Sequence, residues 1–194
     1  MKRDLIMSSK DFKSSFLSCE KDCEEILKRL FVQSQPYCND LKKLLVINTK
    51  DCLDNTTSEV YRKAINEMSL SKLVEEGYIK LTPKLSMPDH EEVKSYIIIS
   101  FDKFRPTSNS EFRDHIISFD ILCHTDCWDL GNFRIRPLKI AGYIDGILNK
   151  ARISGIGQLQ FLSCEELLLD ETLSGYTLIY LATNGSDDLI DNEQ

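Results

Sequence analysis

The chain has no long apolar run: none of its 194 residues belongs to a stretch approaching the roughly 20 apolar residues that cross a bilayer. Met1–Asp4 is followed by the polar Ser8–Asp11 without an apolar segment, so we expect no signal peptide and synthesis in a cytoplasm-like compartment. Basic residues are also few, since 24 Lys and Arg stand against 31 Asp and Glu, a net charge of −7. Because affinity for DNA phosphates comes mainly from Lys and Arg, we do not expect direct duplex binding.

The seven cysteines lack the paired spacing of a zinc site or of a disulfide framework. Cys123, His124 and Cys127 are the best metal candidates, but the spacing is Cys-x3-Cys and no second matching pair lies nearby. Cys123 also belongs to the apolar face of a predicted strand. Buried, reduced thiols are the simpler interpretation, and a metal-assisted hydrolase built on these three residues is the enzyme alternative.

Other catalytic patterns are equally sparse. A cysteine hydrolase needs a histidine beside its thiolate, and His90, His115 and His124 have no such sequence around them. Asp102 and Asp120 could face each other across a hairpin as paired carboxylates, although two strand carboxylates are more simply surface charge. We therefore predict neither an enzyme nor a bound cofactor or metal.

Glycines do not form a phosphate-binding or dinucleotide-binding loop. Gly142 and Gly146 fall within a predicted helix at i, i+4. We expect them to allow that helix to pack closely on a sheet, at a cost of about 1 kcal/mol each relative to alanine.

Hydrophobic periodicity divides the chain into three parts. Residues 1–76 form a helical N-terminal region, in which apolar positions such as Cys23, Ile26 and Leu30 repeat at helical spacing. Residues 77–184 form an antiparallel sheet domain, and residues 185–194 form an acidic tail that we expect to be flexible. Gly77 is predicted to end the last N-terminal helix.

The sheet domain alternates with a period of two and contains one helix. That helix covers 137–151, with Pro137 at its favoured first position. The predicted strands are 78–85 at an edge, 93–105, 112–124, 159–168 and 176–183. The fold class is therefore α+β: an antiparallel sheet of long hairpins with a helix packed across it, plus a helical N-terminal region.

The hairpin of strands 93–105 and 112–124 is the most distinctive element. Ile97, Ile99 and Phe101 share one face opposite Ser100 and Asp102, which predicts one buried and one solvated face. The turn of the hairpin is polar.

Aromatic and cationic side chains gather at the far end of this hairpin. The interface residues that we predict are Phe104, Arg105, Phe112 and Arg113. Lys103 adds to this positive charge, and a second basic group consists of Arg134, Arg136 and Lys139. Solvated loop charge is one interpretation of both groups, and contact with the acidic tail of a second copy is the other.

The stretches Tyr96–Phe101, Ser108–Ser110 and Ile116–His124, followed by Ile140–Asn149, resemble the central hairpin and crossing helix of tailed-phage neck proteins. These are the tail-terminator and head–tail connector proteins, and the likeness extends to portal-associated ring proteins of crAss-like phages. The resemblance implies a non-enzymatic subunit that forms a sixfold or twelvefold ring around the DNA channel. The sheets of adjacent subunits would meet around that ring.

We therefore expect a structural virion protein of the head–tail junction, assembled in the host cytoplasm. Its expected partners are copies of itself, the portal or adaptor, and tail or other neck ring proteins. Genomic DNA would pass nearby without specific binding, and no membrane is involved. The competing class is a cytosolic adaptor that binds one protein partner without forming a ring.

Overall fold

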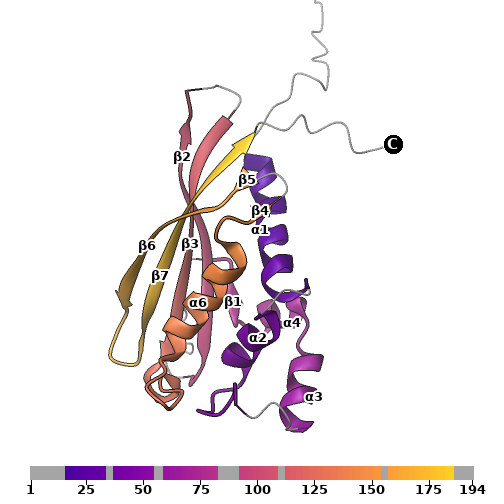
Figure 1. The fold of residues 1–194 in the computed structure, drawn as a ribbon, viewed down its shortest axis with the longest axis vertical. Helices are drawn as coiled ribbons and strands as arrows, with labels where there is room; N and C mark the ends of the chain where they lie inside the picture. The colour runs from indigo at the N-terminus through magenta and orange to yellow at the C-terminus, as the bar shows by residue number, and fades with distance from the viewer. Residues whose placement is uncertain are drawn as a thin grey trace, which may run out of the picture.

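The fold is a sheet with helices packed against one of its faces (Figure 1). The computed structural model describes residues 16–33, 37–54, 59–82, 92–108, 112–153 and 157–185. The main sheet has five strands in the order β1-β2-β3-β7-β6, and every neighbouring pair except β1 with β2 is antiparallel. The predicted α+β class is confirmed.

The helices form where the sequence shows a 3.6-residue apolar period. Their bounds are α1 Phe16–Phe31, α2 Cys38–Val46, α3 Glu59–Glu67, α4 Leu70–Glu75, the short 3-10 helix η2 Thr125–Cys127 and α6 Arg136–Leu148. Gly77 has a φ of 77°, and its N–H bonds the carbonyl of Val74, so it terminates α4 as predicted. No helix in the described ranges is long and apolar enough to span a membrane.

The strands are β1 Ile79–Lys80, β2 Ser95–Pro106, β3 Phe112–His124, β4 Arg152–Ile153, β5 Gly157–Gln158, β6 Gln160–Leu168 and β7 Leu173–Gly185. β3 matches its prediction at both ends. The predicted strand 78–85 contributes only the two residues of β1 among those described, and it pairs in parallel with β2. β4 and β5 form a small second sheet that the periodicity did not indicate.

A shared hydrophobic core joins the helices to one face of the sheet. Ile26 of α1 and Leu41 of α2 belong to the same buried cluster as Ile117 of β3. α6 lies across the sheet as predicted, and the hydroxyl of Tyr180 on β7 donates to Asp145 of α6 at 2.9 Å. The helical region and the strands therefore share one packed interior.

The opposite face of the sheet is not solvated throughout, contrary to the prediction. Near the start of β2, Tyr96, Ile98, Leu122 and Leu173 form a second buried cluster. Tyr96 to Ile99 is in fact a continuous apolar run, which is typical of a strand buried on both faces. Around this cluster the opposite face is buried, whereas β6 stays exposed along most of its length.

Two glycine predictions are corrected. Gly142 and Gly146 lie on the exposed side of α6, and a Cβ on Gly142 would meet no atom within 4 Å, so neither serves close packing on the sheet. Gly175 precedes the predicted strand 176–183 but lies inside β7, where a Cβ would stand 1.7 Å from the carbonyl oxygen of Ile121. Close contact between β3 and β7 therefore requires glycine at position 175.

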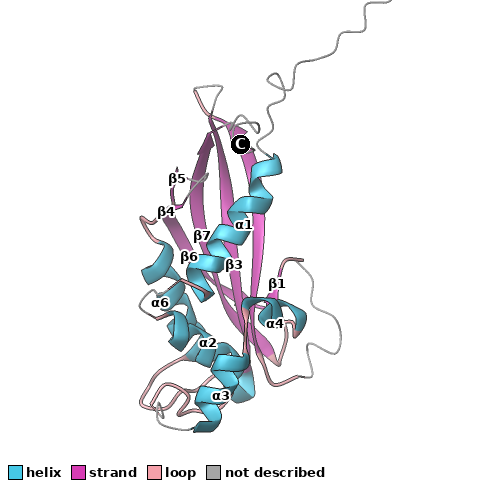
Figure 2. Cartoon of the chain, turned by 90° about the vertical axis from the view of Figure 1, so that its right-hand side faces the viewer, coloured by secondary structure: helices cyan, strands magenta, loops and turns pink. Residues whose placement is uncertain are grey.

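The hairpin of β2 and β3 extends beyond the helices at one end of the molecule (Figures 1 and 2). Thr107 N–H bonds the carbonyl of Phe112 across this end. β7 reaches the same end, because Gly185 pairs with Phe112. The acidic tail predicted for 185–194 lies outside the described residues after Gly185.

Candidate functional site

A β-bulge interrupts β2 near the hairpin end. Asp102 pairs with Ile116 and Arg105 with Asp114, so Lys103 and Phe104 together stand opposite the single residue His115. Lys103 adopts a left-handed φ of 54°, a conformation that costs an L-residue about 1–2 kcal/mol. Its N–H bonds the Asp102 carboxylate at 2.6 Å, which supports the turn.

The bulge changes which face the following residue occupies. With strict alternation, Arg105 would share the helix-covered face with Ile99 and Phe101. The extra residue instead places Arg105 opposite Asp114 on the outer face, and Lys103 lies beside it. Two cations are thus brought together on the face that carries no helix.

A second bulge interrupts β6 on the far side of the sheet. Phe161 pairs with Tyr180 and Ser163 with Ile179, which leaves Leu162 as the extra residue. The side chain of Leu162 is 50% exposed and lies toward the outer face. Phe161 keeps an edge-on contact with Tyr180.

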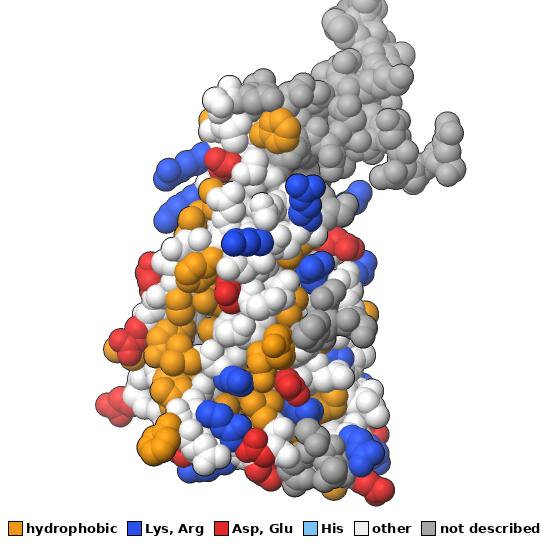
Figure 3. Space-filling model, in the orientation of Figure 1, with side chains coloured by type: hydrophobic (Ala, Val, Ile, Leu, Met, Phe, Trp, Pro, Cys, Tyr) orange, Lys and Arg blue, Asp and Glu red, His pale blue; other side chains and the backbone are white. Residues whose placement is uncertain are grey.

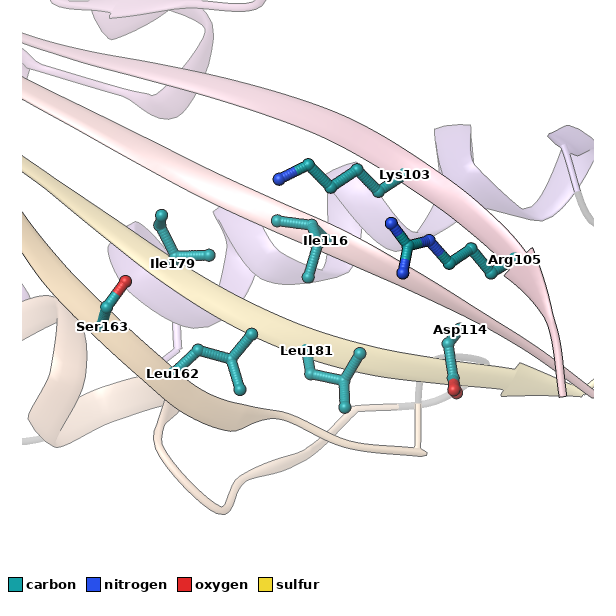
Figure 4. A pocket seen from close by; sticks show the side chains of 8 residues that line it. All are labelled: Lys103, Arg105, Asp114, Ile116, Leu162, Ser163, Ile179 and Leu181. Atoms are coloured by element: carbon teal, nitrogen blue, oxygen red, sulfur yellow. The ribbon is translucent and has the colours of Figure 1, made fainter.

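The two bulges flank a hollow of about 400 Å³ on the outer face (Figure 4). Its centre is aliphatic, with Ile116 from β3, Ile179 and Leu181 from β7, and Leu162 from β6. Lys103 and Arg105 reach over it from β2, while the helices lie behind the sheet. We call these lining residues, with Asp114 and Ser163, the outer hollow.

The outer hollow carries more positive than negative charge. Lys103 and Arg105 are exposed, and within the described part of the chain neither has a carboxylate at ion-pair distance. Asp114 accepts a hydrogen bond from the Thr183 hydroxyl at 2.7 Å. Figure 3 shows hydrophobic side chains along the β6 side of the molecule and Lys and Arg side chains toward the hairpin end.

The four predicted interface residues lie at the hairpin end but divide between its two faces. Arg105 and Phe112 belong to the outer face, and Phe112 is 42% exposed. Arg113 is exposed and, by the alternation of β3, lies on the same side as His115 and Ile117, which is the helix-covered face. Phe104 is half-buried on that same face and stacks on His115, with ring centroids 5.2 Å apart.

His115 lies between Phe104 and Phe101, whose ring centroid is 5.9 Å away. It is 1% exposed, and its Nε2 has no hydrogen-bond partner among the described residues. Burial lowers the pKa of this histidine below its ordinary value, and the charge of Asp114 acts in the opposite direction more weakly. His115 is therefore a neutral packing residue at neutral pH.

The sequence contained no signal for the outer hollow as a whole. Lys103 is not a residue type typical of left-handed turns, so the bulge in β2 was not predicted. Phe161-Leu162 is different, because two adjacent apolar residues interrupt the alternation of β6 and indicate a bulge there. The hollow itself depends on how four strands are aligned.

The cysteine–histidine group occupies a buried strand end. Cys123 and Cys127 are both buried, and the Cys127 thiol contacts the carbonyl of His124 at 3.3 Å. Nδ1 of His124 accepts from the Asp126 N–H and so caps η2. Burial raises the pKa of Cys123 to about 12, which keeps this thiol protonated at neutral pH.

Asp102 and Asp120 do not face each other, since Asp102 pairs with Ile116 and Asp120 with Ile98. Asp120 instead accepts from the Thr177 hydroxyl at 2.7 Å. Across the described ranges, His, Cys, Asp and Glu side chains form no group of three that could hold a metal ion.

The second basic group is structural. Arg134 pairs with Asp54 at 2.9 Å, and Nζ of Lys139 lies 4.9 Å from the ring centroid of Tyr143. Arg136 is fully buried, contrary to the expectation of a solvated or intermolecular charge. Its guanidinium donates to four backbone carbonyls at 2.5 to 2.9 Å, those of Cys127, Leu44, Ile47 and Thr49.

No curated protein matches the chain. A match to a protein family does exist, and it covers residues 39–182, from the start of α2 almost to the end of β7. That span includes the outer hollow and the hairpin. The family is phage-derived and of the Bacillus prophage type, which makes this a phage-related protein. Because the match covers well over half of the sequence, the chain belongs to the YomW family.

Proposed function

We propose that the protein is a structural virion protein that forms a ring at the head–tail junction of a tailed phage. It would connect the portal or adaptor to the tail and surround the DNA channel. Membership in a phage-derived family supports the phage setting. The excess of acidic residues is consistent with DNA passing through the ring without binding to it.

The observation that carries this proposal is the pair of open edges on the sheet. β1 pairs only with Ile97 and Ile98, so no described strand covers the edge of β2 from Ile99 onward. β6 forms the opposite edge, and its outer side has no strand partner among the described residues. Open edges are templates for pairing with another chain. Two different edges produce a head-to-tail contact, and such a contact closes into a ring when the rotation allows.

The hairpin end supplies a second contact surface. It extends beyond the helices and carries exposed Arg105, Phe112 and Arg113 (Figure 2). Aromatic and arginine side chains dominate the binding energy of many interfaces. We therefore assign this end as an arm that contacts a neighbouring subunit.

The test compares two variants with matched changes. Phe112→Ser/Arg113→Glu alters the hairpin end while leaving Phe104 stacked on His115. Phe133→Ser/Arg152→Glu is the control, because Phe133 is fully exposed in the loop beyond the other end of β3 and Arg152 is exposed in β4. Native mass spectrometry and electron microscopy measure rings, alone and with the purified portal of the same phage.

We expect rings from the wild type and the control and only monomers from the hairpin variant, with unchanged circular dichroism for all three. Rings from the hairpin variant would remove the arm from the proposal. A wild type that stays monomeric even with the portal would overturn the ring and leave the single-partner adaptor.

A further inference from the structure

The outer hollow has the chemistry of a peptide-binding surface rather than of bare solvated sheet. Four aliphatic side chains form its centre, and two cations without described carboxylate partners overhang it. Aliphatic surface combined with positive charge selects an acidic segment that carries aliphatic residues of its own. Asp114, which accepts a hydrogen bond from Thr183, would repel acidic groups of that segment, so these groups have to lie closer to Lys103 and Arg105 than to Asp114.

The chain contains a segment of this kind after β7. Residues 186–194 include Asp187, Asp188, Asp191 and Glu193 but no Lys or Arg, and Leu189-Ile190 stands in the middle. We propose that the outer hollow of one copy binds the C-terminal segment of a neighbouring copy. Leu189 and Ile190 would cover the aliphatic centre, and the preceding aspartates would face Lys103 and Arg105.

The direction of β7 favours a neighbouring copy as the source of the segment. Ile179 and Leu181 lie in the hollow, and the strand then runs to Gly185 at the hairpin end. The chain therefore leaves the sheet heading away from its own hollow. Leu189 and Ile190 follow Gly185 by four and five residues, a reach of about 13–17 Å, so the hollow that they fill has to lie next to the hairpin end of the neighbouring copy.

This docking rests on the proposed function, because it needs copies held side by side. In a head-to-tail ring each copy has one outer hollow and one C-terminal segment, so the segment of each copy binds the outer hollow of the next copy. Linking the segment to a subunit that is already docked raises its effective concentration to about the millimolar range, so a modest intrinsic affinity suffices.

Photo-crosslinking in the full chain tests the proposal. Leu189 is replaced by p-benzoylphenylalanine, and 15N-labelled chains lacking the probe are mixed with unlabelled chains carrying it. After irradiation, mass spectrometry identifies the crosslinked residue and whether the joined peptides differ in isotope. We expect isotopically mixed crosslinks at Leu162, Ile179 or Leu181. Crosslinks only within one chain, or only to sites outside the hollow, would overturn the proposal.

Charge reversal adds a matched comparison. Lys103→Glu/Arg105→Glu in the labelled chain should lower the yield of mixed crosslinks at least tenfold, and adding Asp187→Lys/Asp188→Lys to the probe chain should restore it. Lys150→Glu/Arg152→Glu is the control, since both residues are exposed and lie outside the hollow. An unchanged yield in the hollow variant would contradict the assigned role of the two cations.

Electron microscopy of the same mixtures separates this docking from the ring itself. Rings without hollow crosslinks would refute the docking and leave the ring proposal intact. Hollow crosslinks between copies without rings would support the docking and refute the ring.

Discussion

Arg136 ties three segments of the chain together through backbone carbonyls. Leu44 and Ile47 lie in the last turn and at the C-cap of α2, where carbonyls have no partner within the helix. The guanidinium satisfies them and also complements the negative end of the helix. Its bonds to Cys127 and Thr49 connect α2 to the loop that leads into α6.

Replacing Arg136 with Met should lower the free energy of unfolding by about 3 kcal/mol or more, because several buried carbonyls would lose their donors. Urea denaturation followed by circular dichroism measures the change. Arg152→Met, at an exposed position, should stay within about 0.5 kcal/mol of the wild type. A loss below about 1 kcal/mol for Arg136→Met would mean that water replaces the guanidinium.

His115 makes stability depend on pH. Its folded-state pKa lies below the ordinary 6.5, so the unfolded chain takes up a proton first as pH falls. The stabilisation is therefore complete above about pH 6.5 and is lost progressively as pH decreases toward the folded-state pKa.

Removing the titrating group isolates this effect from that of the carboxylates. We expect the wild type to lose more stability than His115→Leu between about pH 7.5 and 5.5, measured by urea midpoints at each pH. Asp114 adds an opposing charge and is present in both proteins. Parallel pH profiles would show that His115 is protonated equally in both states.

At the scale of elements, the pairing of β3 with β7 depends on the absence of a side chain at Gly175. β7 lies between β3 and β6 and pairs with β3 along its whole length. At Gly175 the backbone of β3 approaches so closely that a Cβ would overlap the Ile121 carbonyl. The two strands would have to separate to admit any other residue.

Two alanine substitutions should therefore have opposite effects. Gly175→Ala should lower stability by about 3 kcal/mol or more, because backbone must move to relieve the overlap. Gly142→Ala, in open space on α6, should raise stability by about 0.5–1 kcal/mol. Thermal unfolding of both variants measures the difference, and a destabilising Gly142→Ala would contradict its open surroundings.

At the scale of the whole molecule, the helices cover one face of the sheet. The outer face is buried near the start of β2 and exposed around the outer hollow. β6 carries exposed Leu162 and Leu168 along an open edge, the latter 71% exposed. Exposed apolar residues on an open edge strand favour pairing with another chain. The proposed ring uses this edge against the open part of β2.

A charge at the β6 edge should therefore weaken self-association without affecting the fold. Leu168→Glu is expected to shift the association midpoint at least tenfold toward higher concentration, measured by light scattering over a dilution series. Its unfolding free energy should remain within about 0.5 kcal/mol of the wild type, since the side chain is exposed. Unchanged association would place the contact between subunits elsewhere.

The order and type of the main elements can be predicted from the sequence, because helix and strand periods are local properties. β3 at 112–124 and the helix across the sheet followed from apolar spacing alone. The burial of Arg136, the glycine within β7, the parallel pairing of β1 and the outer hollow were decided only by tertiary structure. Each depends on which distant backbone lies opposite: a bulge exists only relative to its partner strand, and the buried Arg136 needs carbonyls from residues 44–49, far away in the sequence, and from Cys127. The four hairpin residues lie at the hairpin end, and the bulge at Lys103 decides which face Phe104 and Arg105 each occupy.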